Sequence, residues 1–95
     1  MSTFVFSFRG AKDRTLNEAD EAAWGSWFGE IGTQIADFGH RVGETSPVGN
    51  CGPDTELSGY VLVNADDLES AASLAKGCPA LNQGGGVEVG STIEM

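Results

Sequence analysis

His40 is the only histidine in the chain, and imidazole is the one side chain that ordinarily changes protonation between about pH 5 and 8. Asp37 precedes it by three residues. If the two residues lie across the end of a helix, the Asp37 carboxylate can orient the imidazole, and His40 can then act as a general base. The alternative is a surface histidine that interacts with the C-terminal dipole of that helix. Asp37 and His40 are therefore the catalytic candidates.

Two polar residues near the amino terminus, Ser7 and Arg9, are candidates for ligand binding. They alternate with Phe6 and Phe8 in a predicted strand, so they lie on the face opposite the phenylalanines. Arg9 at the mouth of a cleft could hold a carboxylate ligand. The alternative is an ordinary ion pair with a nearby aspartate or glutamate.

Tyr60 and Glu88 are the other two candidates for ligand binding. The Tyr60 hydroxyl either donates to a ligand or lies at the rim of a core that the ring fills. Glu88 lies between Val87 and Val89 in a predicted strand. In a closed cleft, desolvation would favour its protonated form, and Glu88 could act as an acid or base. On an edge strand it is instead solvated and opposes edge pairing.

The sequence contains no pattern that predicts a metal or cofactor. The glycines 84–86 precede a predicted strand, whereas phosphate-binding glycines precede a helix. Two separate cysteines, Cys51 and Cys78, do not provide a structural zinc site with a single histidine. We therefore expect no cofactor and no bound metal.

The composition is strongly acidic, with 14 Asp and Glu residues against 5 Lys and Arg residues and a net charge of −9. Such a charge disfavours nucleic acid and anionic membrane surfaces as partners. It fits either a solubilising surface or an interface for a basic partner. There is no basic leader and no run of roughly 20 apolar residues, so a cytoplasmic protein with reduced cysteines is expected.

The elements of the first half are predicted from the spacing of apolar residues. Phe4, Phe6 and Phe8 alternate with Val5, Ser7 and Arg9, which predicts a strand with one aromatic face. Thr15 and Glu18 fit a capping box, and the helix that follows is predicted to run to about Phe38. One face of this helix collects the large apolar residues Trp24, Trp27, Phe28, Ile31, Ile35 and Phe38. The two tryptophans either fill the core or line an apolar pocket.

Small residues follow the apolar face of this predicted helix at Gly25, Gly29, Gly32 and Ala36. A glycine within a helix costs about 1 kcal/mol relative to alanine. Close approach of another backbone would offset that cost, so we expect the sheet or a second helix there. The alternative is curvature of the helix or simple sequence drift.

The second half predicts strand, helix, turn and strand in that order. Ser58–Asn64 is rich in β-branched and aromatic residues, and Asp66 with Glu69 fits a capping box. Lys76, Gly77 and Pro79 predict the helix end, with Gly77 as a left-handed stop. Glycines 84–86 form a turn before a strand over Val87–Ile93. A short strand over His40–Thr45 and a loop over Ser46–Glu56 join the two halves.

These elements predict an α+β protein with the ferredoxin-like order βαββαβ. Its four-stranded antiparallel sheet carries two helices on one face and leaves the other face open. That face includes Val5, Ser7 and Arg9. It also includes either Gly59, Val61 and Val63 or Tyr60, Leu62 and Asn64.

The segment SGYVLVNADDLESAASLAKGCPAL, followed by GGGVEV, resembles the YCII-related family, also called the DGPF-domain family. The strand TFVFSF and the helix AAWGSWFGEIG extend the resemblance, which implies a single YCII-like domain over residues 1–95. The DGPF tetrapeptide itself is absent, and the corresponding region is shortened to GNCGPDTELSG.

The resemblance implies a homodimer in which two sheets pack face to face as a dimeric α/β barrel. It also implies a cleft beside the sheet that binds a small organic ligand. The alternative is a cofactor-free enzyme of the isomerase, lyase or hydrolase type that uses a His-Asp pair. Because fold does not determine function, the sequence leaves enzyme activity open.

Overall fold

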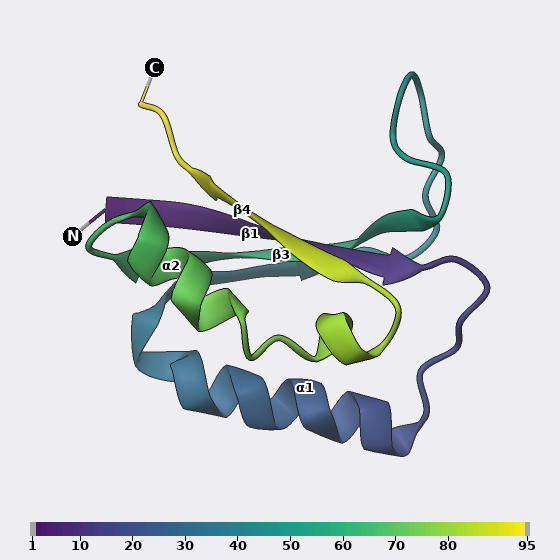
Figure 1. The fold of residues 1–95 in the computed structure, drawn as a ribbon, viewed down its shortest axis with the longest axis horizontal. Coiled ribbons are helices and arrows are strands. Elements are labelled where there is room, and N and C mark those ends of the chain that lie inside the picture. Colours follow the sequence, from purple (N-terminus) through teal and green to yellow (C-terminus); the bar gives the residue numbers. More distant parts are fainter. Residues whose placement is uncertain (1, 95) are drawn as a thin grey trace.

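The computed structural model describes residues 2–94 and contains four strands and two α-helices within that range (Figure 1). The elements in chain order are β1 (Ser2–Ala11), α1 (Glu18–Ile31), β2 (Ile35–Arg41), β3 (Thr55–Ala65), α2 (Leu68–Ala75) and β4 (Gly86–Ser91). Short 3-10 helices cover Gly32–Gln34 and Pro79–Asn82. None of the described helices has the length and apolar character needed to cross a bilayer.

The strands form one sheet in the order β2-β3-β1-β4, and every neighbouring pair is antiparallel. Both helices cover the same face of this sheet (Figure 1). The α+β class and the four-stranded antiparallel sheet are confirmed, and the element order is compatible with the predicted ferredoxin-like arrangement. We call the face away from the helices the open face.

The core lies between the sheet and the helices. Phe4, Phe6 and Phe8 of β1 are buried there, as the alternation predicts, and Trp27 stacks on Phe6 with ring centroids 6.2 Å apart. Val61 and Val63 of β3 are also buried. Because strand side chains alternate, the open face therefore carries Tyr60, Leu62 and Asn64 rather than the valines.

Both predicted ends of the first helix are wrong. The N-cap is Asn17, whose side chain accepts from the Asp20 backbone N–H at 2.8 Å, while the Asp20 carboxylate accepts from the Asn17 N–H at 3.1 Å. The helix ends at Ile31 rather than near Phe38. Ile35 pairs with Val63 in the sheet, and this strand pairing overrides a helical spacing that happens to continue.

The predicted close approach at the glycine strip is also wrong. A Cβ at Gly25, Gly29 or Gly32 would have no heavy atom within 4 Å among the described residues. Ala36 lies in β2 and is exposed. The strip therefore leaves the helix surface open.

Several boundaries in the second half also differ from the predictions. The strand between 40 and 45 is instead Ile35–Arg41, and β3 begins at Thr55, inside the predicted loop. The N-cap of α2 is Asp67 rather than Asp66, and hydrogen bonds from the Ser70 backbone and side chain lower the pKa of Asp67. The last strand ends at Ser91.

Gly77 does not form the predicted left-handed stop. Lys76 caps α2 with a right-handed helical conformation, and Gly77 is not among the residues with positive φ. Its lack of a side chain matters for packing instead. A Cβ at Gly77 would lie 3.2 Å from the indole of Trp27, tighter than most Cβ contacts.

Candidate functional site

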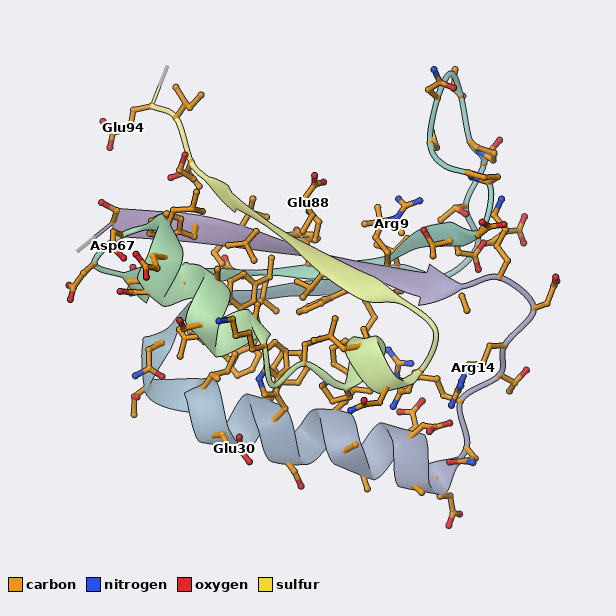
Figure 2. The ribbon with its side chains drawn as sticks, viewed as in Figure 1. Arg9, Arg14, Glu30, Asp67, Glu88 and Glu94 are labelled. Carbon is orange, nitrogen blue, oxygen red and sulfur yellow. The ribbon has the colours of Figure 1, made fainter. Side chains whose placement is uncertain are left out.

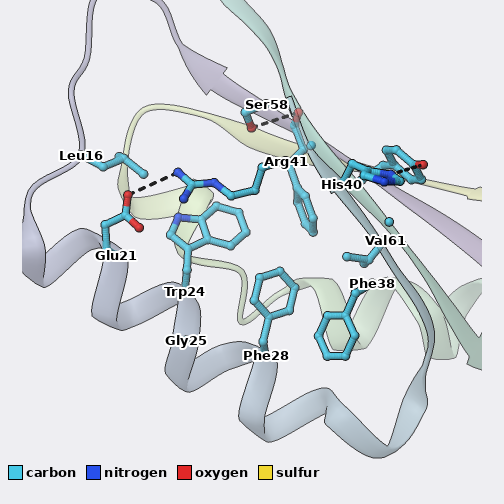
Figure 3. Close-up of a pocket in the computed structure, with 14 residues that line it drawn as sticks. Leu16, Glu21, Trp24, Gly25, Phe28, Phe38, His40, Arg41, Ser58 and Val61 are labelled. Atoms are coloured by element: carbon cyan, nitrogen blue, oxygen red, sulfur yellow. Dashed lines mark hydrogen bonds and ion pairs between the residues drawn. The ribbon is translucent and has the colours of Figure 1, made fainter. Parts of the chain in front are cut away.

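A cleft of about 450 Å³ lies between α1 and the β2–β3 side of the sheet (Figure 3). Trp24 and Phe28 of α1 form one wall, Phe38 and Arg41 of β2 form the other, and Val61 contributes from β3. This size and this mixture of aromatic and few polar groups are typical of sites for small organic molecules.

The walls of the cleft are mainly aromatic. The ring centroids of Trp24 and Phe28 are 5.8 Å apart, and those of Phe28 and Phe38 are 6.0 Å apart. Phe8 from the core meets Trp24 edge to face at 5.0 Å. Phe38 is nevertheless 64% exposed. The cleft therefore offers an accessible aromatic surface that the protein itself does not fill.

A bulge in β2 aims Phe38 into the cleft. Asp37 pairs with Leu62 and His40 pairs with Tyr60, so Phe38 and Gly39 together face the single residue Val61. Gly39 has a φ of +59°, a left-handed conformation that favours glycine. The extra residue keeps Phe38 on the helix side of the sheet while His40 returns to the open face.

Gln83 fixes the orientation of the Trp24 indole. The indole Nε1–H donates to Gln83 Oε1 at 3.0 Å, and Gln83 Nε2 donates to the carbonyl oxygen of Asp20 at 3.5 Å. Gln83 is only 8% exposed and is the sole buried polar residue within residues 2–94. Its role was not predicted, because nothing in the sequence around it marks it as buried.

The mouth of the cleft carries one ion pair. Arg41 Nη2 of β2 lies 3.3 Å from Glu21 Oε1 of α1, and both residues line the cleft (Figure 3). Both side chains remain more than half exposed, at 82% and 51%. The sequence did not single out either residue, since the contact depends on how α1 crosses the edge of the sheet.

The predicted catalytic residues have different partners from those expected. His40 Nδ1 lies 3.0 Å from the hydroxyl oxygen of Tyr60. The Asp37 carboxylate accepts from the backbone N–H of Gly39 at 2.7 Å. Both residues belong to β2 rather than to a helix end. In the structure His40 therefore contacts Tyr60, and the Asp37 carboxylate binds the backbone of the bulge at Gly39.

Three of the predicted ligand-binding residues share a row with His40. Ser7 pairs with Tyr60 on one side and with Glu88 on the other, and Tyr60 pairs with His40. The row crosses all four described strands on the open face. Figure 2 shows Glu88 extending from this face, away from the helices.

Arg9 lies on the same face but is engaged by its own chain. Its guanidinium donates to the Cys51 carbonyl oxygen at 2.6 Å, and to the hydroxyl and carbonyl oxygens of Thr55 at 3.2 and 2.9 Å. Arg9 thereby attaches the loop 42–54 to the end of β1. This is a structural use of the arginine that differs from both predicted ones.

The two cysteines differ in environment, and both are free. Cys51 is exposed, whereas Cys78 is 1% exposed. Burial raises the pKa of the Cys78 thiol to about 11. Within residues 2–94, no three of the His, Cys, Asp and Glu side chains are arranged to hold a metal ion.

Comparison of the chain with protein-family models, with curated proteins and with solved structures gave no significant match.

Proposed function

We propose that the protein binds a small organic ligand in the cleft between α1 and strands β2 and β3. The accessible aromatic wall formed by Trp24, Phe28 and Phe38 carries this proposal. Monomeric proteins normally bury aromatic rings or scatter them singly on the surface. Here Gln83 accepts a hydrogen bond from the Trp24 indole, and the Phe28 and Phe38 rings contact each other, which supports a cleft that is formed before a ligand arrives.

The resemblance to the YCII-related family supports a further part of the proposal, a homodimer that packs open face to open face as a dimeric α/β barrel. The open face contains apolar Val5 and Leu62 next to each other in the β1–β3 register. Symmetric dimers are also the commonest oligomers. In this arrangement Ser7, Tyr60 and Glu88 would lie between the two sheets.

A binding role is favoured over the cofactor-free enzyme with a His-Asp pair. That mechanism needs a carboxylate that orients His40. The Asp37 carboxylate is instead directed to the Gly39 N–H, and the described partner of His40 is Tyr60.

The binding proposal can be tested with the neutral apolar dye N-phenyl-1-naphthylamine, whose fluorescence increases in an apolar site. We expect one saturable site per chain in the native protein. Phe38→Ala should weaken binding roughly 5- to 30-fold, because truncation of a central aromatic anchor costs about 1–2 kcal/mol. Val48→Ala is the matched control, since Val48 is 87% exposed and lies outside the cleft.

Equal affinity of the dye for the wild type and for Phe38→Ala would place the dye elsewhere and contradict the proposal. Absence of saturable binding by the wild type would contradict it as well. Circular dichroism of each variant separates loss of the cleft from loss of the fold.

A further inference from the structure

The charges at the mouth of the cleft indicate which class of small molecule fits it. Besides the aromatic and apolar residues and the polar residues Ser58, Tyr60 and His40, the lining of the cleft includes one guanidinium, that of Arg41, and one carboxylate, that of Glu21. They approach from opposite walls, β2 and α1, and meet at 3.3 Å. A ligand that enters between the walls therefore meets a positive and a negative group side by side.

The Arg41–Glu21 pair can accept new partners at little cost. A single nitrogen contacts a single carboxylate oxygen, and an exposed pair of this kind contributes about 0–1 kcal/mol. A guanidinium has five N–H donors and a carboxylate has about four acceptor positions, so most of both remain available. By contrast, Arg14 reaches both carboxylate oxygens of Asp20, and Arg9 has three acceptors.

The net charge of the ligand follows from the field around the cleft. The chain carries a net charge of −9, which opposes a ligand that is only anionic, and Glu21 adds to this repulsion. A ligand that is only cationic is repelled at close range by the guanidinium of Arg41. A zwitterion has no net charge to oppose, and it can pair with both side chains at once.

The walls define the rest of the ligand. Trp24, Phe28 and Phe38 present ring faces and edges, and aromatic rings pair with one another in offset or edge-to-face geometry. An aromatic ring joined to a zwitterionic head would thus complement both the walls and the mouth.

We propose that the cleft binds a free aromatic α-amino acid. Its ring lies against Phe28 and Phe38, its carboxylate accepts from Arg41, and its ammonium group donates to Glu21. This inference depends on the proposed binding function of the cleft and adds the chemical class of the ligand.

The test compares four compounds that share one ring, by calorimetric titration of the full chain. L-Phenylalanine carries both charges, hydrocinnamate lacks the ammonium group, phenethylamine lacks the carboxylate, and N-acetylphenylalaninamide lacks both charges. We expect phenylalanine to bind at least about tenfold more tightly than each of the others, since tenfold corresponds to about 1.4 kcal/mol.

Two charge-removing variants assign the two contacts separately. Arg41→Gln should lower the affinity for phenylalanine and hydrocinnamate, whereas the affinity for phenethylamine should stay the same or increase. Glu21→Gln should lower the affinity for phenylalanine and phenethylamine and raise the affinity for hydrocinnamate. Lys76→Gln and Glu69→Gln are matched controls, because they change the net charge equally from exposed positions outside the cleft.

The inference is overturned if N-acetylphenylalaninamide or either singly charged compound binds as tightly as phenylalanine. It is also overturned if none of the four binds while the neutral dye still occupies the cleft, and the proposed binding function then stands. If neither the four compounds nor the dye binds, both proposals fail together.

Discussion

His40 Nδ1 and the hydroxyl oxygen of Tyr60 lie 3.0 Å apart, on paired positions of β2 and β3. This contact depends on the bulge at Phe38 and Gly39. If β2 continued from Asp37 in regular alternation, the side chain of His40 would point to the helix side of the sheet. The same bulge therefore places Phe38 in the cleft and His40 on the open face. One of the two register shifts in β2 thus positions residues on both faces of the sheet.

Gly39→Ala is expected to destabilise the protein by more than about 2 kcal/mol. The left-handed backbone at Gly39 strains any residue with a Cβ, and that Cβ would collide with the carbonyl oxygen of Tyr60. Urea unfolding measures the change. The matched substitution Gly29→Ala should instead stabilise by up to about 1 kcal/mol, because Gly29 lies in the last turn of α1 and a Cβ there would meet no heavy atom within 4 Å. If the two variants changed the free energy of unfolding by similar amounts, the requirement for glycine at position 39 of the bulge would be contradicted.

Gln83→Leu is expected to lower the free energy of unfolding by about 1–3 kcal/mol, since the Trp24 indole N–H loses its acceptor in a partly buried position. It should also weaken binding of the dye, because Trp24 is then free to rotate. Gln34→Leu, at a partly exposed residue outside the cleft, is the control. Unaltered dye affinity in a destabilised Gln83→Leu would limit Gln83 to a structural role.

The two thiols should react very differently with a thiol-specific reagent such as DTNB. At pH 8 the native protein should release about one equivalent per chain, from exposed Cys51, and the unfolded protein should release two. The pKa of Cys78 is raised by burial to about 11 from 9.0, so its reactive thiolate is scarce at that pH. Rapid modification of two thiols in the native state would contradict this burial.

Linkage gives the direction of a related pH effect. Because the folded state holds the Cys78 proton more tightly than the unfolded state, the contribution of this thiol to the free energy of unfolding is fully present below about pH 9. It is lost as the pH rises towards about 11. Cys78→Ser should not show this particular dependence, whereas Cys51→Ser should retain it.

Light scattering at micromolar concentration should give the mass of a dimer. Leu62→Lys should convert it to a monomer, because a charge at the centre of the proposed interface would be buried without a partner. Ala22→Lys adds the same charge to an exposed position of α1, on the helix side of the sheet, and should leave the dimer intact. A monomeric wild type would refute the dimeric barrel and would leave the cleft proposal unaffected.

The sequence predicted most of the fold correctly where the pattern depends on one element alone. Phe4, Phe6 and Phe8 show strict alternation, and the strand they predicted is β1. The end of α1 could not be predicted in the same way. Ile35 and Phe38 continue the helical spacing of Trp24 and Ile31, and only pairing with β3 makes them part of a strand.

The candidate site was harder to predict, because it depends on contacts between distant segments. His40 and Tyr60 were both singled out, but their contact follows from the register of β2 on β3. Gln83 and Trp24 are 59 positions apart, and neither residue type alone indicates that they meet. Nothing in the sequence distinguishes Arg41 and Glu21 from other surface charges, because their contact depends on the position of α1 beside β2.

The two indoles have a spectroscopic consequence. Trp24 and Trp27 lie with ring centroids 5.9 Å apart and planes at 77°. Transition dipoles this close couple as an exciton pair, whose circular dichroism depends on their mutual angle. Because Trp27 belongs to the buried core and Trp24 to the cleft wall, a single optical signal would record both the integrity of the interior and the occupation of the cleft.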